Sequence, residues 1–185
     1  VSDVTNTHIL RSSGPGMEWE QAAISSLKEN EVRTVAYLPD TALSSMIDRI
    51  EADDDVTAVE VTREEQAVAV VSGSWLGHRR GAILCQSSGL ATAINALASP
   101  SKPARIPFVG LVTRRGDLGE FNLAQVPFGY AVPSILDDLG IRNHALADED
   151  DVARAVDMAT KTAFATEEPY ILLLESSLLG AKDEF

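Results

Sequence analysis

The chain has 185 residues, of which 45% are hydrophobic and 5% aromatic, and it carries a net charge of −13. This length and composition predict one domain, residues 1–185, with a core built mainly from Ala, Val, Leu and Ile. The acidity argues against nucleic-acid binding, and the lack of a long apolar run or a visible signal peptide argues for a cytoplasmic protein without a membrane span.

Short apolar segments alternate with helical ones along the sequence. The expected strands are Val32–Leu38, Val56–Val61, Ala82–Gln86, Ile106–Thr113, Ile141–Ala145 and Tyr170–Leu174. The expected helices are Thr41–Glu51, Arg63–Leu76, Leu90–Ala98, Ser134–Leu139 and Asp148–Thr166. This alternation predicts an α/β fold, a three-layer doubly wound parallel sheet with helices on both faces. Residues 1–15 and 180–185 are expected to be loose termini.

The loops that follow four of these strands are rich in polar groups or glycine. In doubly wound sheets, ligands bind beyond the carboxyl ends of the strands. We therefore expect these loops to converge on one rim of the molecule. They are Pro39–Thr41, Thr62–Glu64, Gln86–Leu90 and Arg114–Glu120.

Two glutamates, Glu64 and Glu65, stand between an expected strand and an almost wholly apolar helix. A carboxylate at such a junction is poorly solvated and tends to hold or share a proton near neutral pH, as acid–base chemistry requires. The structural alternative is a capping box of Thr62 with Glu65, in which Glu64 is a first-turn acid favoured by the helix dipole. The capping box accounts for Glu65, whereas the wider pattern of polar loops favours a catalytic Glu64.

Two further segments have both a functional and a structural interpretation. Gln86–Leu90, read as a tight turn at Ser87-Ser88-Gly89, has backbone N–H groups and hydroxyls that could hold an anion, or serines that merely cap the next helix. Arg114–Gln125 contains two arginines, which fit tetrahedral oxyanions by forked hydrogen bonding. The alternative for this second segment is a solvated, mobile loop.

The remaining candidates for chemistry are interpreted as structural. No Rossmann fingerprint or P-loop occurs at a strand-to-helix junction, and Gly14-Pro15-Gly16 is read as a loop. His8, His78 and His144 lack metal-ligand spacing, so no metal site is expected in this chain. The single cysteine, Cys85, precludes an internal disulfide and is read as a small buried core residue.

Together these segments resemble the pyrimidine-binding domain of thiamine-diphosphate-dependent decarboxylases, in the branch of the sulfopyruvate and phosphonopyruvate enzymes. The similarity runs from about Val32 to the end, with the motifs in the family's order. Glu64, nine residues before Gly73, matches the activating glutamate of that family. The other matching segments are Tyr37-Leu38-Pro39-Asp40, Gln86-Ser87-Ser88-Gly89-Leu90, Ile94-Asn95-Ala96-Leu97, Arg115-Gly116-Asp117-Leu118-Gly119-Glu120 and Gln125-Val126-Pro127-Phe128-Gly129.

The sequence departs from full-length family members in one respect. It is too short for a second domain and lacks the Gly-Asp-Gly stretch with a downstream Asn that binds the magnesium diphosphate, since Gly116-Asp117 is followed by Leu118. It resembles the alpha subunit of a split sulfopyruvate decarboxylase. The resemblance implies that thiamine diphosphate is shared with a beta subunit, which holds Mg²⁺ and the diphosphate. It also implies an α2β2 or larger hetero-oligomer that is inactive without beta.

The resemblance further implies decarboxylation of an anionic 2-keto acid, foremost 3-sulfopyruvate to sulfoacetaldehyde and CO2. Glu64 would bind a ring nitrogen of the aminopyrimidine, kept poorly hydrated by the apolar residues that follow it. The implied cofactor contacts are Glu64, Pro39, Gln86 and Ser87, and the implied substrate contacts are Asp40, Thr41, Arg114, Arg115 and Gln125. Phosphonopyruvate as substrate, a non-catalytic regulatory subunit and a carboligase remain as alternatives.

Overall fold

A computed structural model of the chain describes residues 19–118, 120 and 122–179. Its strands form one all-parallel sheet in the order β2-β1-β3-β4-β6-β5. The strands are β1 (Val32–Tyr37), β2 (Thr57–Glu60), β3 (Arg80–Gln86), β4 (Val109–Thr113), β5 (Arg142–Leu146) and β6 (Tyr170–Leu174). The doubly wound parallel α/β fold expected from the sequence is therefore confirmed.

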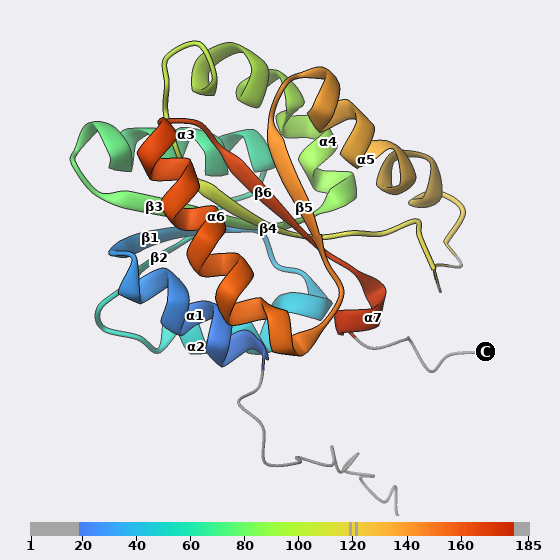
Figure 1. The fold of residues 1–185 in the computed structure, drawn as a ribbon, viewed down its shortest axis with the longest axis horizontal. Coiled ribbons are helices and arrows are strands. Elements are labelled where there is room, and N and C mark those ends of the chain that lie inside the picture. The colour runs from blue at the N-terminus through green and yellow to red at the C-terminus, as the bar shows by residue number, and fades with distance from the viewer. Residues whose placement is uncertain (1–18, 119, 121, 180–185) are drawn as a thin grey trace, which may run out of the picture.

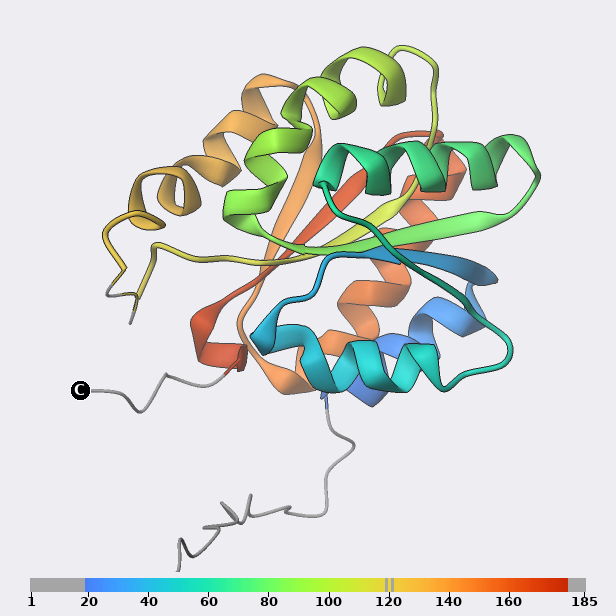
Figure 2. The same cartoon turned by 180° about the vertical axis from the view of Figure 1, so that it is seen from behind.

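Helices cover both faces of the sheet, as Figures 1 and 2 show from opposite sides. One face carries α1 (Trp19–Glu29), α2 (Ser44–Glu51) and α6 (Val152–Thr166), and the other carries α3 (Glu64–Leu76), α4 (Ser87–Ala96) and α5 (Val126–Asp138). The shorter elements are η1 (Thr41–Leu43), η2 (Leu97–Ser101), η3 (Glu149–Asp151) and α7 (Ser176–Leu179). No helix in the described ranges is long and apolar enough to cross a membrane.

The two cores follow from the two-residue period of buried parallel strands. In β3, Ala82 and Leu84 belong to the core under α1, α2 and α6, while Ile83 and Cys85 belong to the core under α3, α4 and α5. Cys85 is 1% exposed, as expected for a core residue. Burial, with the nearby charges of Glu64 and Asp40, raises the pKa of its thiol, so Cys85 is not a nucleophile.

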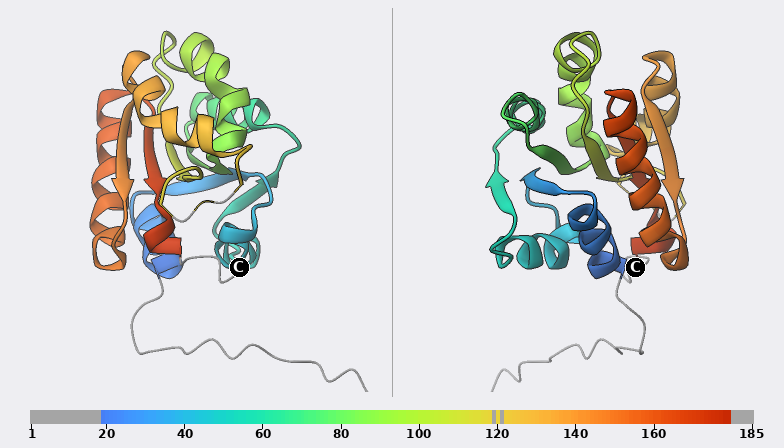
Figure 3. Two further views of the ribbon diagram at one scale, coloured as in Figure 1. Left: turned by 90° about the vertical axis from the view of Figure 1, so that its right-hand side faces the viewer. Right: turned by 60° about the vertical axis from the view of Figure 1, so that its left-hand side comes forward.

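The strand order indicates where a ligand would bind, near the middle of the sheet. From β1 the chain moves outward to β2 and then returns to β3 on the other side of β1. The loops that leave the carboxyl ends of β1 and β3 therefore diverge, and this switch point is where ligands bind in doubly wound sheets. Figure 3 shows the sheet between its two helical layers.

Two helices begin earlier than the sequence indicated, and β4 begins at Val109 rather than Ile106. The expected tight turn at Ser87–Gly89 is instead the first turn of α4. Helix α5 begins at Val126 rather than Ser134 and contains Pro133. A proline has no N–H for the carbonyl four residues earlier. In α5 that carbonyl belongs to Gly129 and instead accepts a hydrogen bond from Arg114 Nε at 3.2 Å, so a contact from another element makes Pro133 tolerable.

The expected capping box involves a different residue. Gln66 Oε1, rather than Glu65, accepts hydrogen bonds at the start of α3, from Thr62 N at 3.1 Å, Thr62 Oγ1 at 3.0 Å and Arg63 N at 3.2 Å. Glu65 instead forms an ion pair with Arg63, with 2.6 Å between Oε1 and Nε. Neither Glu64 nor Glu65 therefore caps the helix, because the neutral side-chain amide of Gln66 accepts the hydrogen bonds at its start.

Candidate active site

Glu64 is the first residue of α3, directly after the loop that leaves β2, and it is half-buried. Its carboxylate lies against α4. Oε2 accepts a hydrogen bond from Thr92 Oγ1 at 3.0 Å, and Oε1 lies beside Gly89. The side chain of the expected catalytic acid thus extends from one helix onto the next at the carboxyl edge of the sheet.

Gly89 is the residue that makes room for this carboxylate. A Cβ at position 89 would lie 1.7 Å from Glu64 Oε1 and 2.4 Å from its Cδ, far inside van der Waals contact. Gly89 belongs to α4, where helical φ and ψ impose no need for glycine. The requirement is therefore for space beside Glu64, not for backbone freedom.

Three of the apolar residues that follow Glu64 on α3 are buried in the core. Ala67, Val68 and Val71 are buried to 1%, 1% and 0% exposure and pack in the core under α3, α4 and α5. Besides burial, the negative charges of Glu64 and Asp40 both raise the pKa of the Cys85 thiol. Two carboxylates from loops far apart in the sequence therefore lie near one side chain of β3.

Asp40 anchors a second cluster, between the ends of β1 and β4. Its side chain is 6% exposed and accepts hydrogen bonds from Ala42 N at 3.1 Å and from Thr113 Oγ1 at 2.6 Å. Arg115 Nη2 lies 3.4 Å from Asp40 Oδ1. The structure therefore brings together Asp40 and Arg115, which the sequence grouped as candidate substrate contacts.

Ser87, an expected cofactor contact, is fully buried at the start of α4. Its Oγ accepts a hydrogen bond from the Arg115 backbone N–H at 3.0 Å. The Arg115 carbonyl lies so close to Gly129 that a Cβ there would be 1.6 Å from its oxygen. The hydroxyl thus secures the long loop to α4, while Gln86 is the half-buried N-cap residue of the same helix.

The two arginines of the long loop have different surroundings. Arg114 Nη1 is 2.8 Å from Glu175 and 2.9 Å from Asp117, and Nε reaches the Gly129 carbonyl. These contacts tie β4, the end of β6 and α5 together. Arg115 has the single 3.4 Å contact to Asp40, and among the described residues its buried Nε has no hydrogen-bond partner. Arg114 is therefore bound to two carboxylates and a carbonyl, whereas the side chain of Arg115 has one long contact.

The other expected site residues lie in the same loops without touching these clusters. Pro39 is exposed between β1 and η1, Thr41 is the exposed first residue of η1, and Gln125 is the half-buried residue that precedes α5. Within the described ranges, neither Thr41 nor Gln125 hydrogen-bonds Glu64 or Asp40 through its side chain. Their part in the site stays a prediction.

Thr92 and Thr113 contact the two carboxylates, but the sequence did not point to them. Thr92 follows Gly89 by three residues and so shares its helix face, a relation hidden by the later helix start inferred from the sequence. Thr113 is the last residue of β4 and is fully buried, which is unusual for a threonine beside charged residues. Correct placement of the α4 start would have revealed Thr92.

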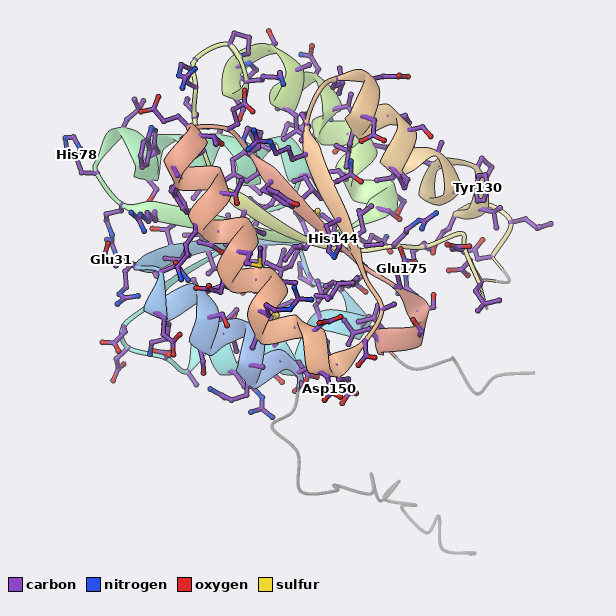
Figure 4. The ribbon with its side chains drawn as sticks, in the orientation of Figure 1. Glu31, His78, Tyr130, His144, Asp150 and Glu175 are labelled. Atoms are coloured by element: carbon purple, nitrogen blue, oxygen red, sulfur yellow. The ribbon has the colours of Figure 1, made fainter. Side chains whose placement is uncertain are left out.

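The histidines of the described chain lie away from both carboxylates. His78 is in the exposed turn between α3 and β3, and His144 is exposed on the edge strand β5. Figure 4 shows His78 at the end of the molecule opposite Glu175 and Tyr130. Among the described residues no group of three or more His, Cys, Asp or Glu could hold a metal ion. His8 and residues 14–16 lie outside those ranges.

Fold and site define a class: a parallel α/β domain with a half-buried glutamate at the carboxyl edge of its sheet, held between two helices. The chain belongs to the thiamine pyrophosphate (thiamine diphosphate) enzymes, since residues 17–118, more than half of it, match the family model "Thiamine pyrophosphate enzyme, N-terminal TPP binding domain". This match confirms the family that the sequence motifs indicated.

Several relatives match over most of this chain. The sulfopyruvate decarboxylase subunit alpha of Methanococcus maripaludis is 30% identical over 160 residues, covering 86% of this chain and 96% of the relative. The same subunit of Methanothermobacter thermautotrophicus is 31% identical, covering 85% and 95%. The phosphonopyruvate decarboxylase of Streptomyces viridochromogenes is 34% identical over 151 residues, 80% of this chain but 38% of that relative.

A solved structure confirms the fold. The 2-oxoglutarate:ferredoxin oxidoreductase of Magnetococcus marinus superposes with a TM-score of 0.72 and 16% sequence identity. The match covers 95% of this chain and 33% of the oxidoreductase chain. The domain thus also occurs within a much longer polypeptide.

Proposed function

We propose that this chain is the alpha subunit of a thiamine-diphosphate-dependent decarboxylase that converts 3-sulfopyruvate to sulfoacetaldehyde and CO2. The observation that carries the proposal is the Glu64 carboxylate, half-buried on α3 and seated on Gly89. Support for the substrate comes from the sulfopyruvate decarboxylase alpha subunits, which match this chain over almost their whole length.

The residues at the carboxyl edge fit the pyrimidine half of the cofactor. Thiamine diphosphate, when bound, supplies an electron sink for the carbanion that remains after CO2 leaves. Glu64 would hydrogen-bond a ring nitrogen of the aminopyrimidine and hold or return a proton there. Pro39 and Gln86, at the ends of β1 and β3, would line the same side. The hydroxyl of Ser87 would act indirectly, by holding the Arg115 loop.

A beta subunit would supply the rest of the site. Following the resemblance to a split sulfopyruvate decarboxylase, Mg²⁺ and the diphosphate would be held by that partner. Three apolar side chains near the carboxyl edge, Leu118, Leu123 and Tyr130, are 83%, 83% and 69% exposed. If these side chains adjoin one another, they would form the kind of apolar patch that marks a partner-binding surface. An α2β2 or larger assembly would bury these side chains.

Arg115, rather than Arg114, is the better candidate for the sulfonate group of the substrate. The guanidinium of Arg114 already has two carboxylates and a carbonyl as partners. Arg115 has one long contact, to Asp40. The Asp40 carboxylate would keep hydrogen bonds from Thr113 and Ala42 N if Arg115 turned to the substrate. A guanidinium with free donors is suited to a tetrahedral anion.

Exchanging each arginine for glutamine should separate these roles. Arg115→Gln is expected to raise the KM for the keto acid about tenfold or more with little loss of stability, because a charge-assisted contact to substrate is removed. Arg114→Gln is expected to lower the melting temperature instead, since Glu175 and Asp117 lose their cation. Steady-state kinetics and thermal unfolding of both variants measure this, and a KM effect confined to Arg114→Gln would contradict the assignment.

The function itself is tested by reconstitution with a beta subunit. The two chains, thiamine diphosphate and Mg²⁺ should together release CO2 from 3-sulfopyruvate, while this chain alone should release none.

Phosphonopyruvate is the second candidate substrate, favoured by the 34% identity to a phosphonopyruvate decarboxylase. Faster release from phosphonopyruvate would shift the assignment to that substrate, and binding of beta without any turnover would indicate a regulatory subunit. Carbon–carbon bond formation from added aldehydes would instead identify a carboligase.

A further inference from the structure

The Thr92 hydroxyl on α4 lies among three acceptors at the start of α3. Its Oγ1 is 2.9 Å from Gly89 O, 3.0 Å from Glu64 Oε2 and 3.2 Å from Glu65 Oε2. A hydroxyl has one proton to donate. The Gly89 carbonyl is inside a helix, where the amide four residues on also reaches it. The hydroxyl can serve one of these three acceptors at a time, and Gly89 O already has the helix amide as a donor, so we assign the proton to Glu64 Oε2.

Helix α4 fixes both oxygens of Glu64 from one face. Gly89 and Thr92 are three residues apart and so lie one above the other on the helix surface. Gly89 leaves the space that Oε1 occupies, and Thr92 donates to Oε2. The carboxylate is thus confined by a contact surface on one side and a directional hydrogen bond on the other.

Arg63, the residue before Glu64, forms its ion pair with Glu65 and not with Glu64. Its Nε is 2.6 Å from Glu65 Oε1. A backbone hydrogen bond at its own N–H, with a smaller contribution from Arg63, lowers the pKa of Glu65, so that carboxylate stays ionised and keeps the arginine. No other described cation is within ion-pair distance of Glu64. The Thr92 hydroxyl therefore orients the Glu64 carboxylate without bringing a second charge to it.

We propose that Thr92 is a positioning residue for cofactor activation, whose hydroxyl fixes the Glu64 carboxylate on the surface of Gly89. This inference rests on the proposed role of Glu64 toward the aminopyrimidine. Thr92 is exposed at the rim of this chain, so its side chain is open to substitution without disturbing the core. Its methyl group is not required by the geometry, and serine should replace it.

The test compares Thr92→Val, which has the same shape without a hydroxyl, with Thr92→Ser, which keeps it. Thr166→Val is the control, because Thr166 also bonds a carbonyl of its own helix, at 2.8 Å, but at the far end of α6, where it additionally accepts from Arg142 Nη1 at 3.2 Å. The side-chain carboxyl ¹³C signal of Glu64 in the full chain, assigned by its loss in Glu64→Gln, is measured without cofactor. The kcat of each variant is measured in the complex with beta.

Thr92→Val is expected to move the Glu64 carboxyl signal and to lower kcat about tenfold, the factor for one lost hydrogen bond to a charged group. Thr92→Ser and Thr166→Val should leave both near wild type. An unmoved signal and wild-type kcat in Thr92→Val would overturn the proposal, as would failure of serine to restore them. Because the signal is read without cofactor or turnover, absence of decarboxylation in the wild-type complex would reject the proposed function separately.

Discussion

Replacing Glu64 with glutamine is expected to lower the kcat of the complex with beta by about 10²–10⁴-fold, the usual contribution of one acid–base group. Glutamine keeps the size of the side chain but cannot accept and return a proton. The fold should survive, because Glu64 is half-buried at a helix start and its described hydrogen bond is to the surface residue Thr92. Decarboxylation rate and circular dichroism of the variant measure the two effects.

Glu149→Gln is a suitable control for Glu64→Gln. Glu149 is also a first-turn glutamate, in η3, but it is exposed and lies on the opposite helical layer from α3. Its substitution should leave turnover and stability unchanged, since surface substitutions of this kind have small effects. Turnover of Glu64→Gln within threefold of this control would reject Glu64 as the activating acid.

Replacing Gly89 with alanine should lower kcat about a hundredfold, the factor associated with a displacement of about 1 Å in a catalytic group. The new methyl carbon would lie 1.7 Å from Glu64 Oε1, so the carboxylate must move. The fold should persist, because the clashing atoms are at the end of a flexible side chain and alanine favours the helix. Turnover and melting temperature together show whether the loss is local.

Gly73 provides the matched comparison. It lies in α3, and an added Cβ there would meet nothing within 4 Å. Gly73→Ala should therefore keep full turnover and gain stability, by up to about 1 kcal/mol, from helix propensity alone. If Gly89→Ala behaves like Gly73→Ala, the close approach of Glu64 to α4 does not matter for catalysis.

Local patterns predicted the layers of this protein well and its helix starts less well. Apolar runs in the interior strands marked positions that are buried on both faces, such as Leu84 and Ile171. The start of α5 was missed because Gly129 and Pro133 disfavour a helix interior, although Pro127 lies in the first turn, where proline is tolerated. Tolerance of Pro133 depends on Arg114, whose Nε binds the carbonyl that Pro133 leaves free, and this contact is invisible in the local sequence.

The candidate site was predictable in its location and in part of its chemistry. Strand and helix alternation sufficed to place polar loops at one rim, and the motif around Glu64 made this residue the candidate acid. The division of labour between Arg114 and Arg115 was not predictable, because both precede the same glycine and have equal charge. It depends on Glu175, sixty-one residues beyond Arg114, lying within 2.8 Å.

By itself, the sequence determined the fold class, the order of layers and the presence of an acidic group at the carboxyl edge, because periodicity and strand-to-helix junctions are local properties of the chain. Only the tertiary structure decided that Glu64 rests on Gly89 under the Thr92 hydroxyl and that Arg63 is paired with Glu65. These contacts depend on how closely α3 and α4 pack, and that spacing arises when distant segments share one core.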